Sequence, residues 1–140
     1  PDKKSAYKTI MKAIDSGNAF EKFQQSVNLQ GGSIDKIELE NIPKYQIILK
    51  ADKNGVIAKI DTETAGWCLV KMGCTAQKFG QQLDYSAGIE FYKKLGDHVD
   101  SNEPIARVFG SNEKKINDAK KKLKPAFTIS EKYKVSPLIL

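Results

Sequence analysis

The sequence predicts an α+β fold in which a helical segment precedes a domain of mixed strands and helices. In the first forty-odd residues, apolar side chains recur at the spacing of one helical face, and from Tyr45 onward short β-rich runs replace that pattern. The 140 residues, 40% hydrophobic and 29% charged, are typical of a globular protein. No apolar run has the length of a membrane helix and no signal peptide is recognisable, so we expect a cytoplasmic protein.

Two helices are predicted in the first segment, with Gly17 as the stop of the first. Asn18 is placed to cap the second helix, which the pair Gly31 and Gly32 ends. An apolar stripe on both helices needs a surface to pack on, so we expect a helical hairpin over residues 1–44. The stripe consists of Ile10, Ile14, Phe20, Phe23 and Val27.

Residues 45–49 and 56–60 are two β-rich runs separated by a short polar stretch. That stretch ends in Asn54 and Gly55, a pair that tolerates positive φ and favours a tight turn. We therefore expect these two runs to form a β-hairpin.

Three further strands are predicted near residues 88–92, 105–109 and 127–129. Between the first two lies a turn region that contains Gly96 and Asp97. We expect this turn to return the chain for a second strand pairing.

Two helices are expected among these strands. Thr62 is placed to cap the first, and Gly73 ends it. Asn112 or Ser111 can cap the second, and Pro125 breaks it. The buried stripe of the second helix is Ile116, Ala119 and Leu123.

Several segments together resemble a known family. Residues 55–62, 84–89, 94–100 and 103–106 are similar, in order, spacing and residue type, to the C-terminal domain of pyrimidine-nucleoside and thymidine phosphorylases. Residues 13–30 resemble the helical stretch that precedes this domain in those enzymes. The resemblance covers nearly the whole chain.

The resemblance implies a β-hammerhead, barrel-sandwich-like domain over residues 45–140, with residues 1–44 belonging to an upstream phosphate-binding domain. It implies the C-terminal part of an enzyme that cleaves thymidine or uridine with phosphate into free base and pentose 1-phosphate. Its partners would be the upstream phosphate-binding and helical domains, which bind inorganic phosphate and the pyrimidine nucleoside, in a homodimeric enzyme. Neither nucleic acid nor membrane is expected as a partner, and both thymidine and uridine stay open as substrates.

The catalytic motifs of that family are absent from this sequence. In the family, a Gly/Ser/Thr-rich phosphate loop and an Arg/Lys pair that grips the base lie upstream, and neither occurs here. We therefore expect no catalytic, cofactor-binding or metal-binding residue, no cofactor, and no activity of the chain alone.

Within the segments that resemble the family, which we call signature segments, the residues are expected to have structural roles. Asp84 and Tyr85 are placed to pin the entry to a strand, with the Tyr85 ring packed. Asn102 stands where a glycine is commoner, and Asn tolerates positive φ. Residues 72–80 depart from the family pattern, which has a glycine cluster and an arginine there.

The residue types that most often carry chemistry are sparse. His98 is the sole histidine and lies beside a turn between Asp97 and Asp100, without the partners that a metal site or a catalytic triad needs. Cys68 and Cys74 have no second Cys or His pair at zinc-ligand spacing. Packing is the expected role of both cysteines.

Two alternative functions stay open. Residues 94–99 and 104–106 also resemble the recurring turn of biotinyl and lipoyl carrier domains, and Lys71 beside Met72 echoes a modifiable lysine, although a helix is predicted there. A net charge of +6 would suit nucleic-acid binding, yet Arg107 is the single arginine. We expect the lysine-rich stretch to be the solvated face of an amphipathic helix. It contains Lys114, Lys115, Lys120, Lys121, Lys122 and Lys124.

Overall fold

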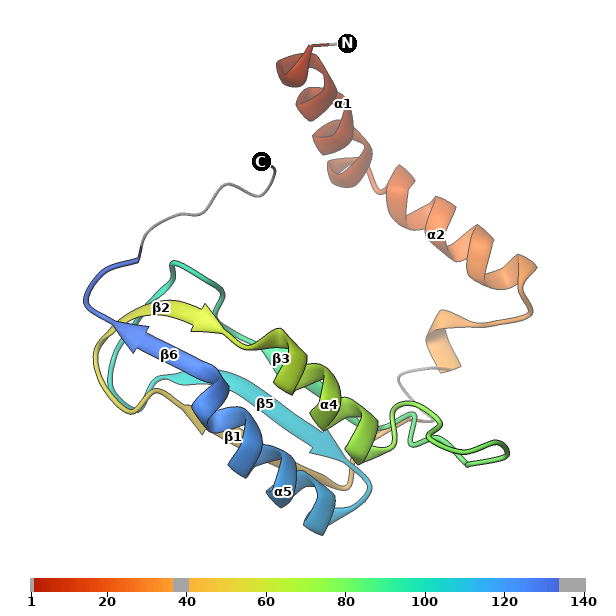
Figure 1. Cartoon of the computed structure of the whole chain (residues 1–140). Coiled ribbons are helices and arrows are strands. Elements are labelled where there is room, and N and C mark those ends of the chain that lie inside the picture. Colours follow the sequence, from red (N-terminus) through yellow and green to blue (C-terminus); the bar gives the residue numbers. More distant parts are fainter. Residues whose placement is uncertain (1, 37–40, 134–140) are drawn as a thin grey trace. The chain divides into compact units, whose positions relative to one another are not determined.

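The computed structural model describes residues 2–36 and 41–133 (Figure 1). The chain divides into two compact units, Pro1–Asn41 and Ile42–Leu140. The first unit contains helices α1 and α2, and the second contains every described strand. The assignment of residues 1–44 to an upstream domain stays a prediction.

The first unit begins with helix α1 (Lys3–Asp15), which the carboxylate of Asp2 caps. Helix α2 (Asn18–Leu29) follows after Gly17, whose φ is +81°. Gly17 occupies the N-cap position of α2, and no side chain makes a capping hydrogen bond there. The prediction that Asn18 caps this helix is therefore wrong, because the helix already includes it.

The predicted hairpin is also wrong. Figure 1 shows α2 continuing away from the end of α1 instead of folding back along it. The short link bends the chain at one left-handed residue without reversing it. Neither helix has a buried residue, so the apolar stripe is open within this unit. The large apolar side chains of α1 and α2 that are more than half exposed are Tyr7, Ile10, Ile14, Phe20, Phe23 and Leu29.

The second unit contains two three-stranded antiparallel sheets. One has the strand order β1-β5-β3, and the other has the order β4-β2-β6. Strands β3 and β5 correspond to the runs predicted near residues 88–92 and 105–109, and they pair as neighbours. The strands are β1 (Tyr45–Lys50), β2 (Gly55–Ile60), β3 (Gly88–Phe91), β4 (His98–Val99), β5 (Pro104–Gly110) and β6 (Phe127–Ser130).

The hairpin predicted between residues 45–49 and 56–60 does not form. Strand β1 pairs with β5, whereas β2 pairs with β4 and β6, so the link between β1 and β2 crosses from one sheet to the other. The polar groups of this link bind a distant turn: Asn54 Oδ1 accepts from the Ser101 amide at 2.6 Å. The Ala51 carbonyl accepts from the Asn102 amide at 2.9 Å. These bonds replace the local ones that a hairpin turn would make.

Helix α4 (Thr62–Met72) follows β2 directly. Asp61 caps it, because its carboxylate accepts hydrogen bonds from the Thr64 amide at 3.1 Å and the Thr64 hydroxyl at 2.8 Å. The prediction that Thr62 is the cap is wrong by one position. Gly73 ends the helix with φ of +102°, as predicted.

Helix α5 (Glu113–Leu123) follows β5. Asn112 caps it by accepting a hydrogen bond from the Lys115 amide at 3.0 Å, which confirms one of the two predicted caps. A 3₁₀ turn, η1 (Lys124–Ala126), contains Pro125 and leads into β6. The predicted end of the helix before this proline is confirmed.

The two sheets and two helices enclose one core. Figure 1 shows α4 and α5 side by side, with α5 packed on β1 and β5. The predicted stripe of α5 is buried there, with no residue of it more than 4% exposed. The α+β prediction is confirmed, and none of the described helices has the length and apolarity to cross a bilayer. Core residues from α4 and α5 are Ala65, Cys68, Met72, Ile116, Ala119 and Leu123.

Candidate functional site

The carboxylate of Asp84 holds the segment of residues 84–89, one of the signature segments that resemble the family. Its Oδ1 accepts hydrogen bonds from the Ser86 amide at 3.1 Å and the Ser86 hydroxyl at 2.6 Å. Its Oδ2 accepts from the Ser111 amide at 3.0 Å and the Ser111 hydroxyl at 2.6 Å. Asp84 therefore joins the loop before β3 to the link between β5 and α5, and it makes the local bonds that the sequence predicted.

The electrostatics of Asp84 follow from these contacts. Partial burial raises the pKa of this carboxyl, but the hydrogen bonds from Ser111 and Ser86 favour the charged form and outweigh burial. The net result is a pKa below the ordinary value. All four acceptor positions are used within the protein, so the contacts of this carboxylate fit a structural role.

Tyr85 is 75% exposed, so the prediction that its ring packs is wrong. The Ala87 amide donates to the Asp84 carbonyl at 3.2 Å, which closes a turn with Tyr85 at its corner. A side chain at the corner of a surface turn points to solvent. The scaffold role in this segment belongs to Asp84 and not to Tyr85.

The turn at Gly96 and Asp97 pairs with strand β2. The Gly96 amide donates to the Ile57 carbonyl at 2.9 Å, and the Ile57 amide donates to the Asp97 carbonyl at 3.0 Å. Gly96 has φ of +88°, and the Asp97 carboxylate accepts from the Lys94 amide at 2.7 Å. Asn102, with φ of +67°, is the one described non-glycine residue at positive φ. Each of these residues shapes the backbone, as predicted.

The histidine and the cysteines are not brought together. His98 is exposed on β4, where its carbonyl accepts from Lys93 Nζ at 3.2 Å. Cys68 is 1% exposed, and Cys74 is partly buried; burial raises the pKa of both thiols. Residues 2–36 and 41–133 hold no group of three His, Cys, Asp or Glu side chains that could bind a metal.

The loop at residues 72–80, which departs from the family pattern, has its own hydrogen bonds. Gln77 Nε2 donates to the Val70 carbonyl at 3.0 Å, and the Gln77 amide donates to Gln81 Oε1 at 3.0 Å. Phe79 is fully exposed at the surface of this loop. The loop thus folds back on the end of α4 without an arginine.

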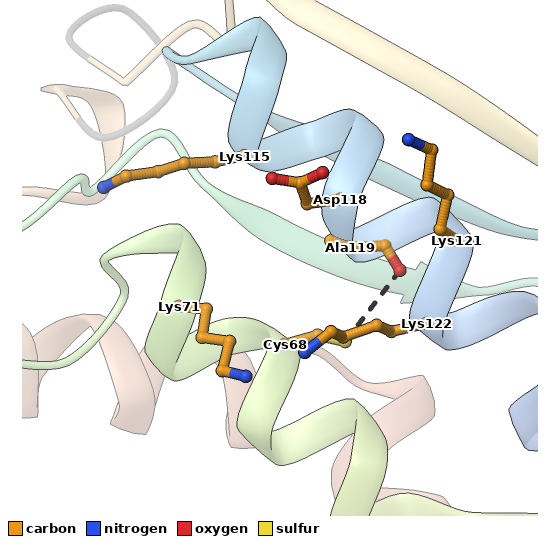
Figure 2. Close-up of a pocket in the computed structure, with 7 residues that line it drawn as sticks. All are labelled: Cys68, Lys71, Lys115, Asp118, Ala119, Lys121 and Lys122. Atoms are coloured by element: carbon orange, nitrogen blue, oxygen red, sulfur yellow. Dashed lines mark hydrogen bonds between the residues drawn. The ribbon is translucent and has the colours of Figure 1, made fainter.

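A concave site that sequence reasoning missed lies between α4 and α5 (Figure 2). The cavity has a volume of about 250 Å³. We call it the lysine groove, because four lysines line it. Its lining residues are Cys68, Lys71, Lys115, Asp118, Ala119, Lys121 and Lys122.

Contacts across the lysine groove connect the two helices. The Cys68 thiol donates to the Ala119 carbonyl at 3.9 Å, and Lys115 Nζ donates to the Met72 carbonyl at 3.4 Å. The nearby ammonium group of Lys122 disfavours the charged form of Lys71 and lowers its pKa. The lysine run was visible in the sequence, but its meeting with Lys71 depends on the packing of two helices distant in sequence.

Comparison with known proteins identifies the class. Residues 56–130 match the model of the pyrimidine nucleoside phosphorylase C-terminal domain, and the chain belongs to this family. A relative is the pyrimidine-nucleoside phosphorylase of Staphylococcus aureus (strain bovine RF122 / ET3-1), 33% identical over 134 residues. The match covers 94% of this chain and 30% of the relative's length. These matches do not favour the carrier and nucleic-acid interpretations. Lys71, the candidate modifiable lysine of a carrier domain, lies on helix α4 and not at the tip of a hairpin.

Proposed function

We propose that this chain forms the C-terminal part of a pyrimidine-nucleoside phosphorylase, which cleaves thymidine or uridine with inorganic phosphate into the free base and a pentose 1-phosphate. The observation that carries the proposal is the 33% identity to the Staphylococcus aureus relative, which extends over 94% of the chain. The chain corresponds to only 30% of that relative's length. The greater part of such an enzyme is therefore available to bind phosphate and nucleoside.

In this proposal the second unit is scaffold and contributes no catalytic residue. The signature residues Asp84, Gly96 and Asn102 support this role, because each makes contacts or adopts a φ angle that the turns themselves require. The finer fold assignment, a β-hammerhead, barrel-sandwich-like domain over residues 45–140, belongs to the same proposal. Two small antiparallel sheets around a common core are compatible with it.

The helical segment at residues 1–44 is proposed to belong to the upstream phosphate-binding domain. Its large apolar side chains are open within their own unit, and burial of each would contribute about 1.5–3 kcal/mol. That exposed stripe is a surface that an upstream domain of the same enzyme would cover. The intact enzyme is proposed to be a cytoplasmic homodimer, in which the C-terminal domain supports closure over the bound nucleoside.

The test is an assay of base release from thymidine and uridine in phosphate buffer. The chain alone is expected to give none, with a mock purification as the control for contaminating enzyme. A chimera in which residues 1–140 replace the matching segment of the Staphylococcus aureus relative is expected to release base. The same relative without that segment is the negative control. Turnover by the isolated chain, or a chimera that melts cooperatively and has no activity, would contradict the proposal.

A further inference from the structure

Two positive charges from different helices meet in the lysine groove. Lys71 lies in the last turn of α4, and Lys122 lies in the last turn of α5. In the view of Figure 2 the Lys71 side chain lies next to Cys68 on α4, and the Lys122 side chain reaches from α5 across Cys68. In the part of the chain that the structure describes, neither lysine forms an ion pair with a carboxylate. The groove therefore has uncompensated positive charge.

The surroundings of Cys68 support the same geometry. Burial raises the pKa of its thiol, while the charges of Lys122 and Lys71 lower it. Both lysines line the same cavity as this sulfur atom. Because Cys68 is only 1% exposed, it forms part of the floor of the groove, with the lysines above.

An amphipathic helix alone does not explain this arrangement. Cations in the last turn of a helix are favoured by the helix dipole, which accounts for the presence of Lys71 and Lys122. Like charges repel, however, and long lysine side chains on a wet surface are free to point apart. Lys115 differs from them, because its ammonium group donates to the Met72 carbonyl. The convergence of the other two leaves a position between them at which a negative charge would be stabilised.

We propose that the lysine groove binds a small multivalent oxyanion of the phosphate class, held between Lys71 and Lys122. The chemistry recognised is that of pyrophosphate or of a nucleotide's phosphate chain. An anion with two or more charges can accept hydrogen bonds from both ammonium groups at once and removes their repulsion. Lys115 and Lys121 are the other two cations of the lining, and Asp118 is the one carboxylate there.

The size and composition of the groove favour a small ligand over a nucleic acid. A cavity of about 250 Å³ between two helices of 11 residues each is a local site. Its lining contains neither an arginine nor an aromatic side chain, the groups on which nucleic-acid sites stack bases. An extended strand would also need a charged path beyond the groove.

The experiment is calorimetric titration of pyrophosphate into the full chain of 140 residues at low ionic strength. We expect one saturable site. Lys71→Gln and Lys122→Gln should each weaken binding by about tenfold, the effect of losing one charged hydrogen bond. Lys114→Gln is the matched control, because it removes the same charge from an exposed position of α5 outside the groove. Its affinity should stay within about twofold of the wild type, since distant exposed charges are screened.

Two further variants distinguish binding in the lysine groove from nonspecific attraction of the anion to the positively charged chain. Lys71→Arg keeps the charge and should retain most of the affinity. Asp118→Asn removes the one carboxylate of the lining and should tighten binding by about twofold, a gain that loss of structure would not produce. Melting curves of all variants check that each is folded.

Competition by ATP distinguishes the sources of the anion. If ATP displaces pyrophosphate, the groove recognises a nucleotide's phosphate chain as well; if it does not, free pyrophosphate is the ligand. The proposal is overturned if pyrophosphate shows no saturable binding, or if Lys114→Gln weakens it as much as Lys71→Gln. Tighter binding of a DNA duplex through Lys71 and Lys122 would also overturn it.

Discussion

Replacement of Asp84 by alanine tests the scaffold role of the signature segment. The change removes an acceptor of four hydrogen bonds, two from Ser86 and two from Ser111. A hydrogen bond to a charged acceptor contributes about 1.5–3 kcal/mol to stability. These four bonds are partly exposed, and only two serine residues donate them, so their contributions do not add in full. We therefore expect the free energy of unfolding to fall by about 2–4 kcal/mol. In a unit of this size the melting temperature should fall by about 10–20 °C.

The pH dependence of the loss gives a second measurement. The folded state lowers the pKa of Asp84, so its contribution to stability is complete above the unfolded pKa of about 3.9. As the pH falls below that value, the unfolded chain takes up the proton first, and the contribution disappears as the pH passes the folded pKa. The stability gap between wild type and Asp84→Ala should therefore narrow from about pH 7 to about pH 3.

Urea unfolding at both pH values measures this gap. Asp100→Asn is the control, because it removes an exposed turn carboxylate of the same charge. Its effect on unfolding free energy should stay within about 0.5 kcal/mol. An Asp84→Ala chain that unfolds like this control, or a gap that stays constant on acidification, would refute the reasoning.

Substitutions at three further positions have expected effects on the free energy of unfolding, measured in the same urea assay. Gly96→Val should lower the free energy of unfolding by about 1–3 kcal/mol, because φ is +88° and the new Cβ would lie 3.2 Å from the Tyr133 ring. Gly96→Asn should lower it by less, since Asn tolerates positive φ. Equal losses from the two variants would argue against backbone strain at this position. Tyr85→Ala should change stability by no more than about 0.5 kcal/mol, since the side chain is 75% exposed, and a large loss would show an unrecognised contact. Leu123→Ala should cost about 2–5 kcal/mol, because Leu123 is 0% exposed, and a neutral result would contradict the described core.

Features that depend on neighbouring residues could be predicted from the sequence. The cap at Asn112 and the stop at Gly73 depend on residue types within one helical turn. The buried stripe of α5 follows from its apolar spacing, and the positive φ of Gly96 and Asn102 follows from the few residues that tolerate it. In each case the cause lies within a few positions of the effect.

Strand pairing could not be predicted in the same way. Asn54 and Gly55 have the composition of a hairpin turn, but the Asn54 side chain binds the Ser101 amide. Gly55 instead opens β2, where a Cβ atom would lie 2.6 Å from the Ser130 carbonyl oxygen. A glycine is required at position 55 because β6, a strand distant in sequence, approaches its backbone closely. Local turn chemistry does not contain that information.

The lysine run on α5 shows the same division at the candidate site. Its spacing predicts which face of the helix is wet, and Lys114 fits that prediction with an exposed side chain outside the groove. Lys122 meets Lys71 because the two helices approach closely where their side chains are small, at Cys68 and Ala119. Lys71 and Lys122 follow Cys68 and Ala119 by three residues, and all four residues line the groove. The groove therefore arises from a pair of small buried residues, and its charge comes from lysines that the helical pattern assigns to solvent.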